Sequence, residues 1–309
     1  MGIDRGGQEG GGPTLLGARE ERQSVRRDGE AAGDHASMYR SPPLPAARAK
    51  VEYRPVLRLL SGLYWAYIVV SMPVLFAGAL LVFLVTFPFD RRRMLLHVYS
   101  CAWATLYILS NPLWRARVQG RGRLPWRGPA VIVANHLSML DILVLYGLFR
   151  PFKWVAKGEL FKVPVVGWNM VINDYVRIWR GDRESVKQMM AHGRAHLARG
   201  TPLLFFPEGT RALDGRLQRF KDGAFRLAFE AKVPVVPVAL SGTFEALPKH
   251  GLIMRGRMEA RVEVLEPLDA AAFASADALR DAARAAIAAA LPERHRPAEA
   301  PQLPTLGAS

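Results

Sequence analysis

Two long uncharged segments dominate the first third of the chain. No residue from Leu59 to Phe89 carries a charge, and a second uncharged segment runs from Met94 to Trp114. Because about 20 apolar residues cross a bilayer, the first segment is long enough to span one. The pattern predicts a membrane-associated helical segment over residues 53–114, either as a hairpin that enters one leaflet or as one span followed by an interfacial helix.

Basic residues flank the first segment on both sides. Lys50, Arg54 and Arg58 precede it, and Arg91 to Arg93 follow it. Cytoplasmic ends of membrane segments are enriched in Lys and Arg, so these flanks favour a re-entrant hairpin with both ends in the cytoplasm. A buried helix pair in a soluble protein is the alternative, although such long uncharged segments are rare there.

After a polar link at 119–125, short apolar segments alternate with amphipathic ones. We expect strands near residues 130–134, 152–156, 175–179, 202–206, 235–240 and 259–265, and helices near 139–149, 184–199, 217–231 and 271–291. Alternation of this kind is typical of an α/β fold with a mostly parallel sheet flanked by helices. We therefore expect an α/β domain at 115–292, preceded by the membrane-embedded helical hairpin.

Two details of that sheet can be anticipated. Pro234 and Pro237 limit backbone hydrogen bonding in the strand near 235–240, which favours an edge position or a strand start. The alanine-rich helix near 271–291 is expected to pack on the edge of the sheet.

The two ends of the chain have no sustained hydrophobic period. Residues 1–52 are rich in Gly, Arg, Glu, Pro and Ala, and residues 293–309 are rich in Pro, so both ends are expected to be disordered. The single cysteine, Cys101, excludes an internal disulfide.

The formal net charge of +15 predicts an anionic partner. The basic residues are scattered along the chain and form no nucleic-acid-binding motif, whereas long apolar segments are present. We therefore expect membrane lipids as a partner, and not nucleic acid.

A histidine and an aspartate follow the apolar run at 130–134. Residues 135–141 read Asn-His-Leu-Ser-Met-Leu-Asp, which places His136 at the end of a predicted strand and Asp141 in the first turn of a helix. Open α/β sheets place their chemistry at this end of their strands, and a histidine held by a carboxylate can take a proton from an alcohol. The alternative is structural, because Ser138 and Asp141 also fit a capping box.

A second polar turn closes a later strand. Residues 205–211 read Phe-Phe-Pro-Glu-Gly-Thr-Arg, so a proline and a glycine turn the backbone at the same end of the sheet as the histidine. Gly209 permits close approach of a ligand, Thr210 offers a hydroxyl, and Arg211 offers a planar cation suited to phosphate. An ion pair between Glu208 and Arg211 in an ordinary loop is the structural alternative.

A further cation and a histidine pair complete the set of candidates. Lys157 follows a predicted strand, so it is a second candidate for binding a phosphate. His192 and His196 lie four residues apart and share a helix face. No acid or cysteine lies between them, so the sequence predicts a solvated face and no metal site.

In order and spacing, these motifs resemble the four motif blocks of the glycerolipid acyltransferase family, most closely the 1-acylglycerol-3-phosphate acyltransferases. The resemblance covers residues 115–265 and rests on the blocks at 135–141, 157–160, 205–211 and 233–238. It implies transfer of a fatty acyl chain from acyl-CoA or acyl carrier protein to the free hydroxyl of 1-acylglycerol-3-phosphate. It also implies a membrane enzyme whose active site faces the cytoplasm, with no cofactor beyond the acyl donor.

The resemblance assigns roles to the candidate residues. His136 and Asp141 would be catalytic, and the glycerol phosphate would be bound by Glu208, Gly209, Thr210, Arg211 and Lys157. Asn135, Ser138 and Arg180 are further candidates at the same site. The same His136 and Asp141 pair could act on other acceptors, such as a lyso-ornithine lipid or lysophosphatidylethanolamine. A non-catalytic membrane protein that binds anionic lipid is the alternative from another class.

Overall fold

The computed structural model describes residues 55–247, 249 and 251–298. The helices longer than a single turn are α2 (Pro55–Thr86), α3 (Met94–Leu109), α4 (Leu140–Tyr146), α5 (Val166–Ile172), α6 (Arg183–Ala198), α7 (Gly223–Ala231) and α8 (Ala276–Ala290). The strands are β1 (Trp114–Gln119), β2 (Val131–Ala134), β3 (Lys153–Lys157), β4 (Val176–Ile178), β5 (Leu203–Phe205), β6 (Val235–Ser241) and β7 (Met258–Val264). The disorder predicted for 1–52 and for 299–309 falls outside the described residues.

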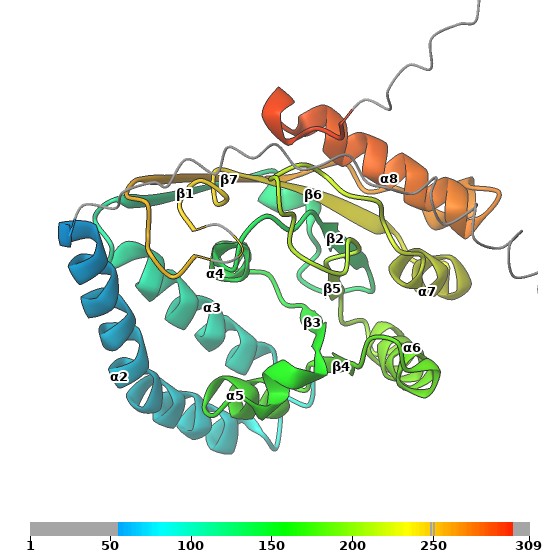
Figure 1. Ribbon diagram of the computed structural model, residues 1–309. Coiled ribbons are helices and arrows are strands. Elements are labelled where there is room, and N and C mark those ends of the chain that lie inside the picture. The colour runs from blue at the N-terminus through cyan, green and yellow to red at the C-terminus, as the bar shows by residue number, and fades with distance from the viewer. Residues whose placement is uncertain (1–54, 248, 250, 299–309) are drawn as a thin grey trace, which may run out of the picture. The chain divides into compact units, whose positions relative to one another are not determined.

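The seven strands form one sheet in the order β1-β7-β6-β2-β5-β3-β4 (Figure 1). Every neighbouring pair is parallel except β6 with β7, which is antiparallel. This confirms the predicted α/β fold with a mostly parallel sheet. The sequence pattern missed β1 and α5. β1 is mostly exposed and carries Arg115 and Arg117, so it has no apolar run, and α5 is only seven residues long.

Successive residues of the central strands pack into opposite layers. Val131 and Val133 of β2 belong to a core shared with α6, α7 and α8, whereas Ile132 and Ala134 belong to a core shared with α3 and α4. Side chains alternate between the two faces of a strand, and both faces of this sheet are covered. This explains why the central strands read as continuous apolar runs and not as alternating ones.

The expected packing of α8 on the sheet edge is wrong. Of the two positions expected for the prolines, the edge strand is wrong, whereas Pro234 does lie at a strand start. Helix α8 packs against β6 and α7, and β6 is an interior strand that pairs with both β2 and β7. The two prolines are accommodated within that interior strand. Pro234 precedes it, and the carbonyl of Pro237 accepts from the Leu265 N–H just beyond the last β6–β7 pair, so the missing N–H of Pro237 lies where that ladder ends.

Helices α2 and α3 pack as the predicted hairpin. Among the described residues, α2 is the one helix that is long and apolar enough to cross a membrane. One side of α2 contacts α3 and α5, and Pro73 lies inside the helix without interrupting it. Its other side exposes large apolar residues that include Val69, Val70 and Val74. Helix α3 is different, because most of one face is buried between α2 and α4.

The sequence predicts disorder from residue 293, but the chain is still folded there. Residues Glu293–His295 form a short 3-10 helix, and His295 is buried. The Leu217 N–H donates to the His295 carbonyl at 2.9 Å, and the His295 Nδ1–H donates to the Gly215 carbonyl at 2.7 Å. Residues 293–298 are therefore part of the folded domain, because the loop before α7 needs these partners for its own backbone groups.

Candidate active site

A histidine and a buried carboxylate meet at the carboxyl end of β2. The strand ends at Ala134, and the His136 Nδ1 lies 2.9 Å from Asp141 Oδ2 in α4. The Asp141 side chain is fully buried, whereas the His136 side chain is 14% exposed. The His136 ring stacks on Phe206, with centroids 3.9 Å apart. Nδ1 faces the carboxylate, and Nε2 has no hydrogen-bond partner among the described residues.

Asp141 is held by four donors. Its Oδ2 accepts from the Leu137 N–H at 2.6 Å and the Ser138 N–H at 2.8 Å as well as from His136. Its Oδ1 accepts from the Thr243 hydroxyl at 2.5 Å. A carboxylate with this many donors is fixed in position, and it accepts from the His136 ring in the tautomer that carries its proton on Nδ1.

The Ser138–Asp141 spacing matches a capping box in part. Asp141 accepts from the Ser138 N–H, which is one half of the box, but the Ser138 hydroxyl accepts from the Leu140 N–H and not from the Asp141 N–H. The same carboxylate also orients His136. Ser138 is fully buried and donates to the Leu247 carbonyl at 2.6 Å, so it is placed as a structural residue and not as a nucleophile.

Asn135 also has a structural position. Its amide nitrogen donates to the Leu240 carbonyl at 2.9 Å, and its carbonyl oxygen accepts from the Leu240 N–H at 2.7 Å. These two bonds continue the β2–β6 ladder by one residue and fix the backbone immediately before His136.

Glu208 connects the second turn to the histidine. Its carboxylate accepts from the His136 N–H at 2.7 Å and from the Gln218 N–H at 3.2 Å. Burial raises the pKa of Glu208 to about 7. The expected alternative, an ion pair with Arg211, is not formed in the described structure. The Ala212 N–H donates to the His136 carbonyl at 2.9 Å, so the turn at 205–211 lies on the same rim as His136.

A large apolar cavity of about 730 Å³ opens onto His136. Its walls come from the hairpin and from the domain. Trp65, Ile68 and Met72 of α2 and Trp103 of α3 form one side, and Phe206 lies beside the histidine. Ligand sites are concave, mostly apolar and carry few polar groups, and a cavity of this kind suits a fatty acyl chain.

Three cations line the same cavity. Lys157 is paired with Glu159 at 2.9 Å, and Arg180 is exposed at the end of the turn after β4. Lys221, which the sequence analysis missed, is the third. Thr210 and Arg211 belong to the turn but do not line the cavity. Arg211 has no ion-pair partner in the described part of the chain.

Gly209 is required by its backbone and by its neighbour. Its φ is +72°, and a Cβ at this position would lie 3.0 Å from the Lys221 Nζ. Any side chain there would displace the ammonium group of Lys221. The sequence predicts that a ligand approaches Gly209 closely. In the structure, the side chain of Lys221 lies close to Gly209.

Thr243 and Lys221 were not found from the sequence for a common reason. Each comes from a separate segment, Thr243 after β6 and Lys221 before α7, and neither belongs to a recognised block. A hydroxyl residue close to the carboxyl end of a central strand is the one available signal for Thr243.

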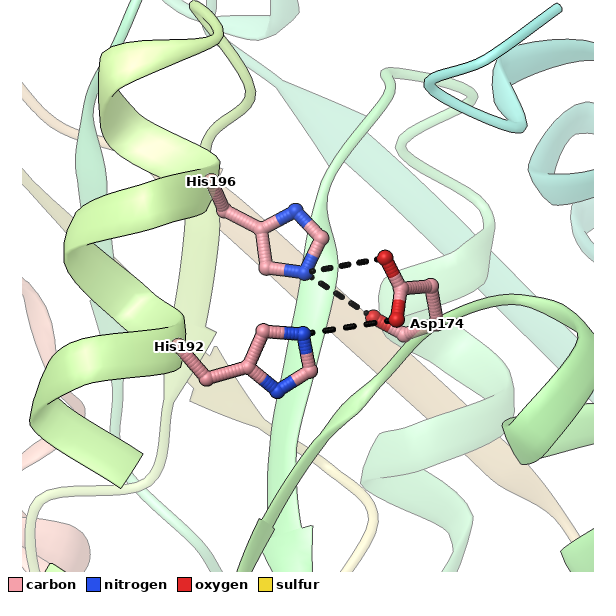
Figure 2. A group of neighbouring side chains, drawn as sticks. All are labelled: Asp174, His192 and His196. Atoms are coloured by element: carbon pink, nitrogen blue, oxygen red, sulfur yellow. Dashed lines mark hydrogen bonds and ion pairs between the residues drawn. The ribbon is translucent and has the colours of Figure 1, made fainter. Parts of the chain in front are cut away.

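The histidine pair on α6 is not the predicted solvated face. His196 is buried, and Asp174, from the turn before β4, faces both rings (Figure 2). The expectation relied on the absence of an acid in the intervening sequence. Asp174 instead reaches the pair from 18 residues upstream of His192, through the crossover from α5.

Known proteins resemble this chain over the region that holds the site. Residues 115–241 match the family model named Acyltransferase. A 1-acyl-sn-glycerol-3-phosphate acyltransferase of Chlamydomonas reinhardtii is 38% identical over 240 residues, covering 76% of this chain and 70% of that protein. A chloroplastic one of Brassica napus is 38% identical over 204 residues, covering 65% of this chain and 57% of that protein.

A solved structure has the same fold. The 1-acyl-sn-glycerophosphate acyltransferase PlsC from Thermotoga maritima superimposes with a TM-score of 0.62 at 26% identity. The similarity covers 76% of this chain and 95% of that one.

Proposed function

Since the chain belongs to the 1-acyl-sn-glycerol-3-phosphate acyltransferase family, we propose that it transfers a fatty acyl chain from an acyl thioester to the free hydroxyl of 1-acylglycerol-3-phosphate. The product is phosphatidic acid. The observation that supports this best is the pairing of His136 Nδ1 with buried Asp141 beside an apolar cavity of about 730 Å³. Neither a solvated histidine nor a plain helix cap accounts for that combination.

We propose that His136 is the general base. Its Nε2 removes the proton of the acceptor hydroxyl, while Asp141 stabilises the imidazolium that forms. The hydroxyl oxygen then attacks the thioester carbonyl, so that a C–O bond forms and the C–S bond breaks. The leaving thiolate takes the proton back from His136. Thioesters are already activated, so positioning and base catalysis supply most of the rate without a protein nucleophile.

The phosphate of the acceptor is assigned to the cations beside the cavity. Lys157, Arg180 and Lys221 all line it. Arg211 and Thr210 follow Gly209 on the same turn, and the long guanidinium side chain can reach the phosphate from outside the lining. Glu208 acts indirectly, because its bond to the His136 N–H positions the base.

Lys221→Ala is expected to raise the KM for 1-acylglycerol-3-phosphate about 10-fold or more with a smaller change in kcat, because a charge-assisted bond to phosphate contributes about 1.5–3 kcal/mol. Steady-state kinetics with varied acceptor measures this. The matched control is Arg226→Ala, which removes an exposed cation from the adjacent helix and should leave KM unchanged. An unchanged KM in Lys221→Ala would exclude Lys221 from phosphate binding.

We place the protein at a membrane with the active site facing the cytoplasm. Helix α2 is joined to the domain at several points along its length. Trp65 Nε1 donates to the Leu252 carbonyl at 2.8 Å, and Phe76 contacts Trp168 of α5. Its opposite side is apolar and exposed. A helix fastened to the domain along its length favours a hairpin lying in one leaflet, from which a lipid acceptor enters the cavity directly.

The direct test is an acyl transfer assay with purified protein and several substrates. We expect phosphatidic acid from 1-acylglycerol-3-phosphate, and much slower acylation of lysophosphatidylethanolamine or a lyso-ornithine lipid, which lack its terminal phosphate. Acyl-CoA and acyl carrier protein are compared as donors in the same assay. Faster acylation of either alternative acceptor would overturn the assignment of 1-acylglycerol-3-phosphate as the acceptor, but it would still support acyl transfer as the activity.

A further inference from the structure

We propose that Asp174, His192 and His196 form a binding site for Zn²⁺, separate from the acyl transfer site. The candidate ligand atoms of the three side chains all lie within 4.8 Å of one another. His192 Nε2 lies 3.3 Å from Asp174 Oδ1, and His196 Nε2 lies 3.6 Å from Asp174 Oδ2. In Figure 2, both rings point a nitrogen at the same carboxylate.

The two distances from the histidines to the carboxylate are close to those of tetrahedral coordination. With metal–ligand bonds of about 2.0–2.1 Å, neighbouring ligand atoms in a tetrahedral zinc site lie about 3.3 Å apart. The helix supplies the two imidazoles from positions i and i+4, on one face, with ring centroids 4.7 Å apart. Three protein ligands leave one coordination position for water. The exposed ring of His192 can turn to complete the geometry, because its side chain is 40% exposed.

His196 would change its hydrogen bond when a metal binds. Its Nε2–H now donates to the Asp174 carbonyl at 3.1 Å. Coordination through Nε2 would place the ring proton on Nδ1 instead.

The types of ligand decide which metal the site accepts. Two basic groups face the turn that carries Asp174, since Arg93 donates to the carbonyls of Val171 and Ile172 and Lys153 donates to the carbonyl of Asn173, but their charge opposes every divalent ion alike. With a single carboxylate, the site is poor for hard cations such as Mg²⁺ or Ca²⁺, which need several oxygen ligands. Two imidazoles instead favour Zn²⁺ and similar metals.

A bound ion would join two elements at the end of the sheet. Asp174 precedes β4, which is the edge strand, and both histidines belong to α6, which packs on β4. The next residue, Tyr175, lines the acyl cavity, as do Ile178 and Met189. The ion would therefore hold the wall of the cavity together without touching the reacting atoms.

The test uses untagged full-length protein, stripped with a chelator and titrated with ZnCl₂. We expect one Zn²⁺ bound per chain by calorimetry and by metal analysis after dialysis, and a higher midpoint of thermal unfolding. MgCl₂ at the same concentration should do neither. His192→Ala and Asp174→Asn should each weaken Zn²⁺ binding at least about 100-fold, since losing even an outer-shell partner costs about 10–100-fold.

The controls separate this site from adventitious binding. Asp174 has φ of +58°, a conformation that asparagine tolerates, so Asp174→Asn preserves the turn while removing the charge. His35→Ala removes a histidine that is not one of the three proposed ligands, and this variant should bind Zn²⁺ as the wild type does. Equal Zn²⁺ binding by the wild type, His192→Ala and Asp174→Asn would overturn the proposal, and so would the absence of any binding to the wild type.

Discussion

His136→Ala is expected to lower kcat for acyl transfer by about 10³–10⁴-fold, near the upper end of what a general base contributes. The reason is geometric. No other titratable side chain among those lining the cavity is held by a buried carboxylate as His136 is held by Asp141. KM should change little, because the imidazole acts on the reacting hydroxyl and not on the phosphate. Initial rates with varied acceptor at a saturating donor concentration measure both constants.

The fold of that variant should survive. Alanine keeps the backbone N–H that donates to Glu208 and the carbonyl that accepts from Ala212. Circular dichroism and the midpoint of thermal unfolding check this. The matched control is Phe206→Leu, which removes the same ring stack but leaves the base, and should lose less than about 10-fold in kcat. A His136→Ala variant that folds and retains wild-type kcat would rule out His136 as the base.

Asp141→Asn is expected to lower kcat by about 10²–10³-fold, within the range associated with general base catalysis. Asparagine has the same shape and can still accept from the His136 Nδ1–H. It lacks the negative charge that stabilises the imidazolium as the proton is transferred. It also supplies an NH₂ group where Asp141 now accepts only, so one of its four donors loses its partner and the unfolding midpoint should fall.

Thr243→Val serves as the graded control for Asp141. It removes the hydroxyl that donates to Oδ1 but leaves the carboxylate and its charge. We expect a decrease in kcat smaller than about 10-fold, since one neutral donor contributes about 1 kcal/mol. If Thr243→Val were as damaging as Asp141→Asn, the charge of Asp141 would not be the important property.

The central strands and the catalytic rim could be predicted because their signals are local. The run 130–134 is fully apolar since both faces of β2 are covered, and the next residues carry the histidine and its acid within one turn. The shared rim of His136 and the turn at 205–211 follows from the parallel order of β2 and β5. Parallel strands place their carboxyl ends on the same side of a sheet.

The features that were missed depend on contacts between distant segments. Thr243 lies 102 residues from its partner Asp141, and Asp174 joins its histidines only when α6 packs on β4. No local period or spacing carries that information. The wrong prediction for the position of α8 has a similar origin. The strand that α8 covers, β6, is interior because β7 pairs with it in the antiparallel direction.

The most direct test of the central claim is a double-mutant cycle on His136 and Asp141. If the carboxylate acts only through the imidazole, the variant carrying both His136→Ala and Asp141→Asn should have the same kcat as His136→Ala alone. Phosphatidic acid formed from 1-acylglycerol-3-phosphate and acyl-CoA gives the four rates. If the double variant were slower than His136→Ala by the full factor that Asp141→Asn causes alone, the two residues would act independently. That result would contradict the claim that Asp141 acts through His136.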